Sequence, residues 1–186
     1  MITTARLVLR AFAEADRDAF RALVADPLVA GDARRVIPRE DADALFDFYR
    51  ACWDEDGVAY AAIERRTDGA FLGMSGLALC RREPPEPPLC EIGWAIGPAH
   101  RGQGFATEAA AAWIDHGFEV LRLPRIHALT WADNVPSLRL IRTLGFLPDA
   151  GFAHPDGEAR AERRAFALTP ALWHGRLAGL GAERRG

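Results

Sequence analysis

The stretch that decides the fold is Pro98-Ala99-His100-Arg101-Gly102-Gln103-Gly104-Phe105-Ala106-Thr107-Glu108. It follows the apolar run 90–96 and precedes an alanine-rich segment, residues 109–121. A buried strand, a turn with two glycines and a helix start leave several backbone N–H groups unpaired and pointing the same way. Such a turn binds anions, because glycine lets a phosphate approach the main chain. The stretch predicts a pyrophosphate site, with Arg101 as a positive charge beside it.

Two better-known phosphate loops do not fit these residues. The Lys-Ser/Thr pair of an NTPase loop is missing, and the glycine spacing differs from G-x-G-x-x-G. The pattern R/Q-x-x-G-x-G/A does fit, as Arg101-x-x-Gly104-x-Ala106. Placed between a strand and a helix, it resembles the acetyl-CoA loop of the GNAT N-acetyltransferases, and HRGQGFATEA resembles their RimJ/RimL-type branch. For so short a match, a glycine-rich turn without a ligand is the alternative.

Composition bounds the class of protein. The 186 residues are 49% hydrophobic and 26% charged, which predicts one domain, 1–186, with a frayed tail at 179–186. A net charge of −3 argues against a nucleic-acid partner. Three cysteines without C-x-x-C spacing suggest neither a disulfide framework nor a zinc site, so no metal is expected. No apolar run reaches 18 residues, so we expect a cytoplasmic protein with no membrane partner.

The rest of the chain predicts strands and helices in an order that matches the same family. Thr4-x-Arg6-Leu7-x-Leu9-Arg10 resembles the first strand of RimJ/RimL-type sequences. Hydrophobic periodicity and turn residues predict the other elements. These are a helix ending at Asp26-Pro27, a helix over 40–53, strands 58–64 and 71–79 joined at Asp68-Gly69, a proline-rich loop 82–88, a fourth strand 89–96, a helix over 105–120, a fifth strand 125–131, a helix starting at Asp133 or Asn134, a closing hairpin 152–168 turning at 154–157, and a short terminal helix from Thr169-Pro170.

A second motif supports the resemblance. Residues 134–146 read N-x-x-S-x-x-L-I-x-x-L-G-F and resemble the second acetyl-CoA motif of the family. The resemblance implies an α+β (α/β-like) GNAT fold, with a central mixed and splayed sheet of about seven strands flanked by helices. It also implies that the pantetheine arm of acetyl-CoA, the cosubstrate, lies between the fourth and fifth strands. The implied cofactor-binding residues are Trp94, Ala95, Ile96, Arg101, Gly102, Gln103, Gly104, Phe105, Ala106, Thr107, Asn134 and Ser137.

The position of Asn134 has two interpretations. Its side chain can meet the amides of the pantetheine arm, with Ser137 near the thioester, or it can simply cap a helix. The capping interpretation would prevail for an isolated motif. Because both motifs occur together, the cofactor role is favoured.

The implied chemistry is attack of an amine on the acetyl thioester in a ternary complex. A backbone N–H near Ala95 or Ile96 would stabilise the oxyanion. Glu91 is the first candidate base and His127 the second, each with a structural role as the alternative. Many family members carry a tyrosine acid where this chain has Ile141, so Ser137 would serve the leaving thiolate, unless no acid is needed.

The predicted function is therefore acetyl transfer from acetyl-CoA to a primary amine. The acceptor partner is either a protein N-terminus or a small-molecule amine, and the protein is expected to be a monomer or homodimer. The alternative is a non-catalytic, regulatory coenzyme A-binding domain of the same fold. Substrate identity lies in loops that face an unknown partner, so the sequence leaves it open.

Overall fold

A computed structural model of the chain describes residues 1–29, 37–80, 89–152 and 163–183. The chain divides into two compact units, Met1–Leu79 with Ile92–Trp113 and Cys80–Glu91 with Ile114–Gly186. Strand β5 (Leu89–Ile96) and helix α4 (Phe105–Glu119) contribute residues to both units. The single domain predicted over 1–186 stays a prediction.

The first unit contains a row of strands joined mainly by antiparallel pairing. Their order is β1-β2-β3-β4-β5. Apart from β5, they are β1 (Ile2–Thr3), β2 (Leu7–Arg10), β3 (Tyr60–Arg65) and β4 (Phe71–Cys80). Strand β3 pairs antiparallel with both β2 and β4, which confirms the predicted hairpin. At its turn, Gly69 adopts a φ of +71° and donates its N–H to the carbonyl of Arg65.

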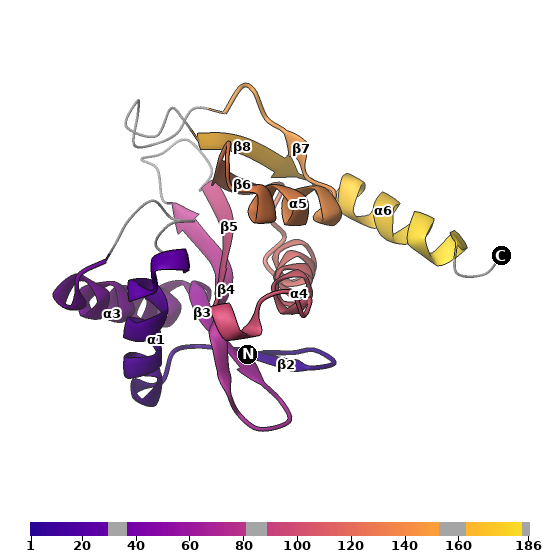
Figure 1. Ribbon diagram of the computed structural model, residues 1–186. Coiled ribbons are helices and arrows are strands. Elements are labelled where there is room, and N and C mark those ends of the chain that lie inside the picture. The colour runs from indigo at the N-terminus through magenta and orange to yellow at the C-terminus, as the bar shows by residue number, and fades with distance from the viewer. Residues whose placement is uncertain (30–36, 81–88, 153–162, 184–186) are drawn as a thin grey trace. The chain divides into compact units, whose positions relative to one another are not determined.

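Two helices of the first unit lie against each other beside β3 (Figure 1). The 3-10 helix η1 (Glu14–Asp16) leads into α1 (Arg17–Ala25), which ends at Asp26 as predicted. Helix α3 (Arg39–Asp56) runs three residues beyond the predicted end and stops at Gly57, whose φ of +69° suits glycine. Phe20 of α1 and Phe46 of α3 are fully buried, with ring centroids 5.4 Å apart in an edge-to-face arrangement.

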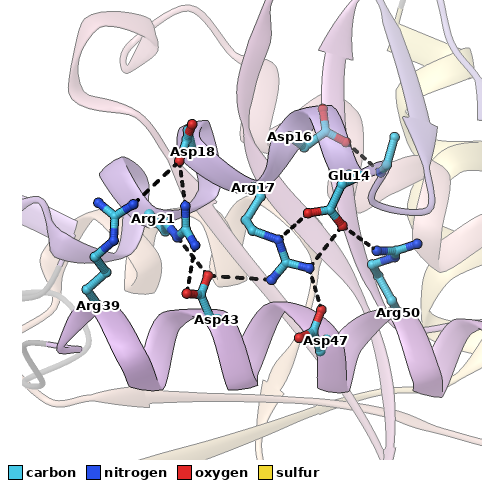
Figure 2. A network of polar contacts seen from close by, with 10 residues as sticks. Glu14, Asp16, Arg17, Asp18, Arg21, Arg39, Asp43, Asp47 and Arg50 are labelled. Atoms are coloured by element: carbon cyan, nitrogen blue, oxygen red, sulfur yellow. Dashed lines mark hydrogen bonds and ion pairs between the residues drawn. The ribbon is translucent and has the colours of Figure 1, made fainter.

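In addition to this aromatic contact, a network of charged side chains joins α1 to α3 (Figure 2). The guanidinium of Arg21 donates two hydrogen bonds of 2.7 Å to the carboxylate of Asp43. Arg17 bonds Glu14 and Asp47, and its guanidinium lies 4.5 Å from the centre of the Phe46 ring. Hydrogen bonds from Arg21 hold the pKa of Asp43 below its usual value. The two helices are therefore joined by a buried aromatic contact and by partly exposed ion pairs.

The second unit contains three further strands and two helices. Strands β6 (Ile126–Trp131), β8 (Arg163–Leu168) and β7 (Leu147–Pro148) lie in that order, and β8 pairs antiparallel with both neighbours. Helix α5 (Val135–Leu144) buries Leu138, Ile141 and Leu144. Helix α6 (Pro170–Glu183) begins where predicted, with Leu172 N–H directed at the Thr169 hydroxyl, and is longer than the short helix expected.

The described residues thus form eight strands and flanking helices, which confirms the α+β class and comes close to the predicted seven strands. The predicted strand over 89–96 agrees with β5 residue for residue. Strand β1 was not predicted. The proline-rich loop 82–88, the turn at 154–157 and residues 184–186 of the predicted tail lie outside the described residues, whereas residues 179–183 of that tail belong to α6. In the part of the chain that is described, no helix is long and apolar enough to cross a membrane.

Candidate active site

The phosphate loop predicted from the sequence, residues 101–104, leads directly into the start of α4. A 3-10 helix, η2 (Pro98–His100), precedes it, and the amide of Glu108 donates to the Gly104 carbonyl to begin α4. The φ angles are +74° at Gly102 and +79° at Gly104, values that L-residues with a side chain rarely adopt. With Gly104 at the helix start, the next three amides have no carbonyl within the helix to bond. Those amides belong to Phe105, Ala106 and Thr107.

The side chain of Arg101 turns back towards β5 instead of standing out from the loop. Its Nε donates to the carbonyl of Ile96 at 3.1 Å. The glutamine of the loop makes a looser contact, from Gln103 Nε2 to the carbonyl of Ala99 at 3.4 Å. Arg101 thus ties the loop to the end of the strand, and its contact with a phosphate stays a prediction.

Residues near the N-terminus close one side of this loop, and sequence reasoning gave them no role. The Glu108 carboxylate accepts from the Thr4 hydroxyl at 2.6 Å, the Arg6 amide at 2.8 Å and Arg6 Nε at 2.6 Å. Arg6 Nη1 also donates to the carbonyl of Gln103 at 2.9 Å. Burial alone would raise the pKa of Glu108, but the bonds from Thr4 and Arg6 outweigh it and lower the pKa. The sequence indicated only that the N-terminal stretch with Thr4 and Arg6 and the stretch with Glu108 both resemble the same family.

Strand β5 presents its peptide groups alternately to β4 and to the opposite edge. The amide of Gly97 donates to the Leu72 carbonyl, so the odd-numbered residues here face β4. A Cβ on Gly73 would collide with the carbonyl oxygen of Ala95, which agrees with that direction. The peptide groups of Trp94 and Ile96 therefore point away from β4. Of the two predicted oxyanion donors, the Ile96 N–H points away from β4 and the Ala95 N–H points towards it.

The motif at residues 134–146, which resembles the second acetyl-CoA motif, spans α5 and both of its caps. Asn134 is the N-cap, and its Oδ1 accepts a hydrogen bond from the Ser137 amide at 3.1 Å. Asn134 and Ser137 are both partly buried. The capping role is thus shown. Since a carboxamide also carries two N–H donors, the cap does not exclude the cofactor role.

The two candidate bases lie in the second unit, in different surroundings. His127 on β6 is 8% exposed, with Nε2 3.4 Å from Asp149 Oδ2 and its ring centroid 4.9 Å from that of Phe152. Burial lowers the pKa of His127, and the charge of Asp149 opposes that shift only in part. Glu91 on β5 is partly exposed. The family's tyrosine position, Ile141, is 1% exposed and belongs to the core of this unit.

The predicted residues therefore separate into two groups. The first unit brings together Trp94, Ala95 and Ile96 of β5 with the phosphate loop and the first turn of α4. The second unit contains Glu91, His127, Asn134 and Ser137. Among the described residues, no cluster of three or more histidine, cysteine, aspartate or glutamate side chains could hold a metal ion.

Comparison with known proteins identifies the family. The model of the acetyltransferase (GNAT) domain matches residues 6–147. An uncharacterized N-acetyltransferase of Bacillus subtilis, YoaA, is 30% identical over 149 residues, covering 78% of this chain and 82% of that protein. The uncharacterized N-acetyltransferase p20 of Bacillus licheniformis is 33% identical over 147 residues, covering 77% of this chain and 80% of its own.

Solved structures show the same fold. An acetyltransferase from Agrobacterium tumefaciens has a TM-score of 0.77 at 26% identity, covering 90% of this chain and 92% of that one. Spermidine N-acetyltransferase from Vibrio cholerae, in complex with CoA and spermine, has a TM-score of 0.72 at 18% identity, covering 91% and 99%. Mycobacterium smegmatis RimJ, in complex with CoA-disulfide, has a TM-score of 0.67 at 22% identity, covering 94% and 89%. The last two likenesses show the fold alone. From the family match over residues 6–147, the chain belongs to the GNAT family and is an acetyl-CoA-dependent N-acetyltransferase.

Proposed function

We propose that the protein transfers an acetyl group from acetyl-CoA to a primary amine by direct attack within a ternary complex. The observation that carries the proposal is the pair of positive-φ glycines, Gly102 and Gly104, immediately before the open first turn of α4. Backbone amides in that turn suit a pyrophosphate, because the partial positive charge of a helix N-terminus and the absence of a Cβ act together.

The oxyanion of the tetrahedral intermediate is stabilised by a backbone N–H of β5. We assign this donor to Ile96, whose peptide group points away from β4, as the direction of Gly97 requires. The pantetheine arm then adds along that edge of β5 and bonds the peptide groups of Trp94 and Ile96. The carbonyl of Ile96 also accepts from Arg101, so the phosphate loop and the oxyanion donor are fixed to each other.

The amine must lose a proton before or during the attack. We assign this role to Glu91, directly or through water, because this partly exposed residue lies on the strand that also supplies the oxyanion donor. His127 is the weaker candidate, since it is buried and held between Asp149 and Phe152. A base that is 8% exposed has little access to an incoming amine.

The leaving thiolate receives little help from the chain. The buried Ile141 side chain cannot protonate a thiolate, so the Ser137 hydroxyl is the proposed partner for the sulfur. A thiol has a pKa near 8.5, so the thiolate is a tolerable leaving group near neutral pH even without an acid. The assistance expected from Ser137 is therefore small.

The acceptor is a protein N-terminus or a small-molecule amine. The sequences HRGQGFATEA and T-x-R-L-x-L-R support a place in the RimJ/RimL-type branch, which favours a protein N-terminus. The solved relatives include both a RimJ protein and a spermidine acetyltransferase, and neither likeness extends beyond the fold. We further propose that the protein is cytoplasmic and that it works as a monomer or homodimer.

The test is release of free thiol from acetyl-CoA in the presence of an amine panel. The panel contains peptides with free N-termini, polyamines and amino acids, each with mass detection of the acetylated product. Thiol release that requires one class of amine would support the proposal and name the acceptor. Protection from heat by coenzyme A without turnover on any amine would show that the chain only binds the cofactor.

A further inference from the structure

The N-terminal segment and the phosphate loop meet at one carboxylate. Glu108, in the first turn of α4, accepts one hydrogen bond from Thr4 and two from Arg6. The Glu108 side chain is 17% exposed. Thr4 and Glu108 are 104 positions apart in the sequence. We call Thr4, Arg6 and Glu108 the clasp.

Arg6 reaches across the loop as well as to Glu108. Its Nη1 bonds the Gln103 carbonyl, and its guanidinium carbon lies 4.6 Å from the centre of the Phe105 ring. The nearest atom to a Cβ built on Gly104 would be Arg6 Nη2, at 3.4 Å. One side chain therefore contacts the residue before Gly104, the residue after it and Glu108 one turn later. This arrangement fixes a loop that its two glycines would otherwise leave free.

The charge of Glu108 makes the arginine necessary. A carboxylate in the first helical turn favours the helix, but it also repels a phosphate that binds the same N-terminus. The ion pair with Arg6, at 2.6 Å, offsets that repulsion while keeping the helix start bonded. A loop ordered before the ligand arrives also loses less conformational entropy on binding.

We propose that the clasp positions the phosphate loop for the pyrophosphate of coenzyme A, with Arg6 neutralising Glu108 beside the bound anion. Thr4, Arg6 and Glu108 are positioning residues, and none of them touches the reacting atoms. The inference rests on the proposed coenzyme A site and adds the device that shapes it.

The test uses Arg6→Ala and the double variant Arg6→Ala/Glu108→Gln. Arg6→Ala leaves an unneutralised carboxylate beside the pyrophosphate, so the Kd for coenzyme A by isothermal titration should rise about tenfold or more. Adding Glu108→Gln removes that charge and should recover a large part of the loss. Dephospho-coenzyme A, which keeps the pyrophosphate, should show the same pattern. With acetyl-pantetheine, which lacks it, kcat/KM should stay within about twofold of wild type.

Arg65→Ala is the matched control. Arg65 lies on β3 opposite Leu7 and forms an ion pair with Asp68. Its replacement therefore removes an arginine–carboxylate pair beside the N-terminal segment but leaves the phosphate loop unchanged. Its coenzyme A affinity should equal that of wild type. Two results would show that the clasp only stabilises the fold. One is a double variant whose coenzyme A affinity is no higher than that of Arg6→Ala; the other is an equal loss of kcat/KM with acetyl-CoA and with acetyl-pantetheine. If the wild-type protein failed to bind coenzyme A at all, the proposed site itself would be wrong. Binding without turnover would instead refute the proposed acetyl transfer, and the effect of the clasp on coenzyme A affinity would still be measured.

Discussion

The Oδ1 of Asn134 accepts a hydrogen bond from the backbone amide of Ser137 at 3.1 Å. This bond makes Asn134 the N-cap of α5 and fixes the orientation of its carboxamide. It also means that two residues of the second acetyl-CoA motif are coupled through the backbone of one helix turn. Capping and ligand binding are therefore not alternatives here, because the oxygen serves the helix while the nitrogen of the same side chain can donate.

Replacing Asn134 by aspartate separates these two roles. The Asn134→Asp variant would keep the oxygen that caps α5 and lose the N–H donors, so the free energy of unfolding should stay near that of wild type. Asn134→Ala should lose about 1 kcal/mol of stability through the missing cap. If the donors serve the pantetheine arm, both variants should weaken coenzyme A binding, as measured by isothermal titration. Wild-type affinity in a stable Asn134→Asp protein would leave Asn134 as a cap alone.

Ser137→Ala tests the group assigned to the leaving thiolate. The bond to Asn134 comes from the backbone amide, so alanine preserves the cap and the fold. We expect kcat to fall by less than the roughly 10²–10⁴-fold typical of general acid catalysis, while the affinity for acetyl-CoA changes little. An unchanged kcat would show that the thiolate leaves without help from this hydroxyl.

Gly104→Ala tests the phosphate loop against a glycine of the same backbone conformation. Gly104 and Gly69 have φ angles of +79° and +71°, so alanine at either site should cost about 1–2 kcal/mol of stability. A Cβ at Gly69 meets no atom within 4 Å, and that turn lies between β3 and β4, apart from the loop. Only Gly104→Ala should weaken coenzyme A binding. Equal affinities in the two folded variants would refute the phosphate site.

Local patterns are sufficient to predict most elements of this chain. Strand β5 is predictable at Leu89–Ile96 because an apolar run is bounded by prolines before it and by the Gly97-Pro98 turn after it. Helix α3 is predicted nearly as well, because its apolar residues recur at helical spacing. These signals depend on residues that are neighbours in the sequence, so the elements can be predicted from the sequence alone.

Contacts between distant residues are not predictable in the same way. The two-residue strand β1 exists because Ile2 and Thr3 pair with Leu9 and Val8, and neither residue pattern requires it. The bonds from Thr4 and Arg6 to Glu108 likewise depend on where the folded chain brings its N-terminus. The direction of the Ile96 N–H, away from β4, follows in the same way from the bond between Gly97 and Leu72. These features come from tertiary structure, so the sequence indicated that the segments matter without showing how.

Acid should weaken the first unit through Asp16. This carboxylate is buried and accepts bonds from Arg10 Nη1 at 2.6 Å, Arg10 Nη2 at 3.0 Å and the Ala13 amide at 2.8 Å. Burial alone would raise the pKa of Asp16, but the bonds from Arg10 and Ala13 outweigh it and lower the pKa. A lowered folded-state pKa contributes stability above the unfolded value, near 3.8, and that stability is lost as the pH falls below it.

The measurement is urea unfolding of wild type and Asp16→Asn at several pH values. At pH 7 the variant should be less stable by about 1.5–3 kcal/mol, since a charged acceptor is lost. The difference should shrink below about pH 4, where the wild-type carboxylate begins to take up a proton on unfolding. Asp18→Asn, at an exposed carboxylate paired with Arg21, is the control and should change stability by less than about 1 kcal/mol. A stability difference that does not vary with pH would show that Asp16 acts through packing rather than charge.

Glu91→Gln tests whether catalysis depends more on positioning than on one base. An amine and a thioester held in contact gain most of their rate from proximity and from an oxyanion donor already in the backbone. The loss of kcat at neutral pH should therefore stay within the roughly 10²–10⁴-fold range of general base catalysis. The loss should shrink as the pH rises towards the pKa of the amine, because the substrate then deprotonates without help. Wild-type rates at every pH would move the assignment to His127 or to a bound water. A complete loss that high pH cannot restore would show that this carboxylate holds the substrate or the fold and does not act as a general base.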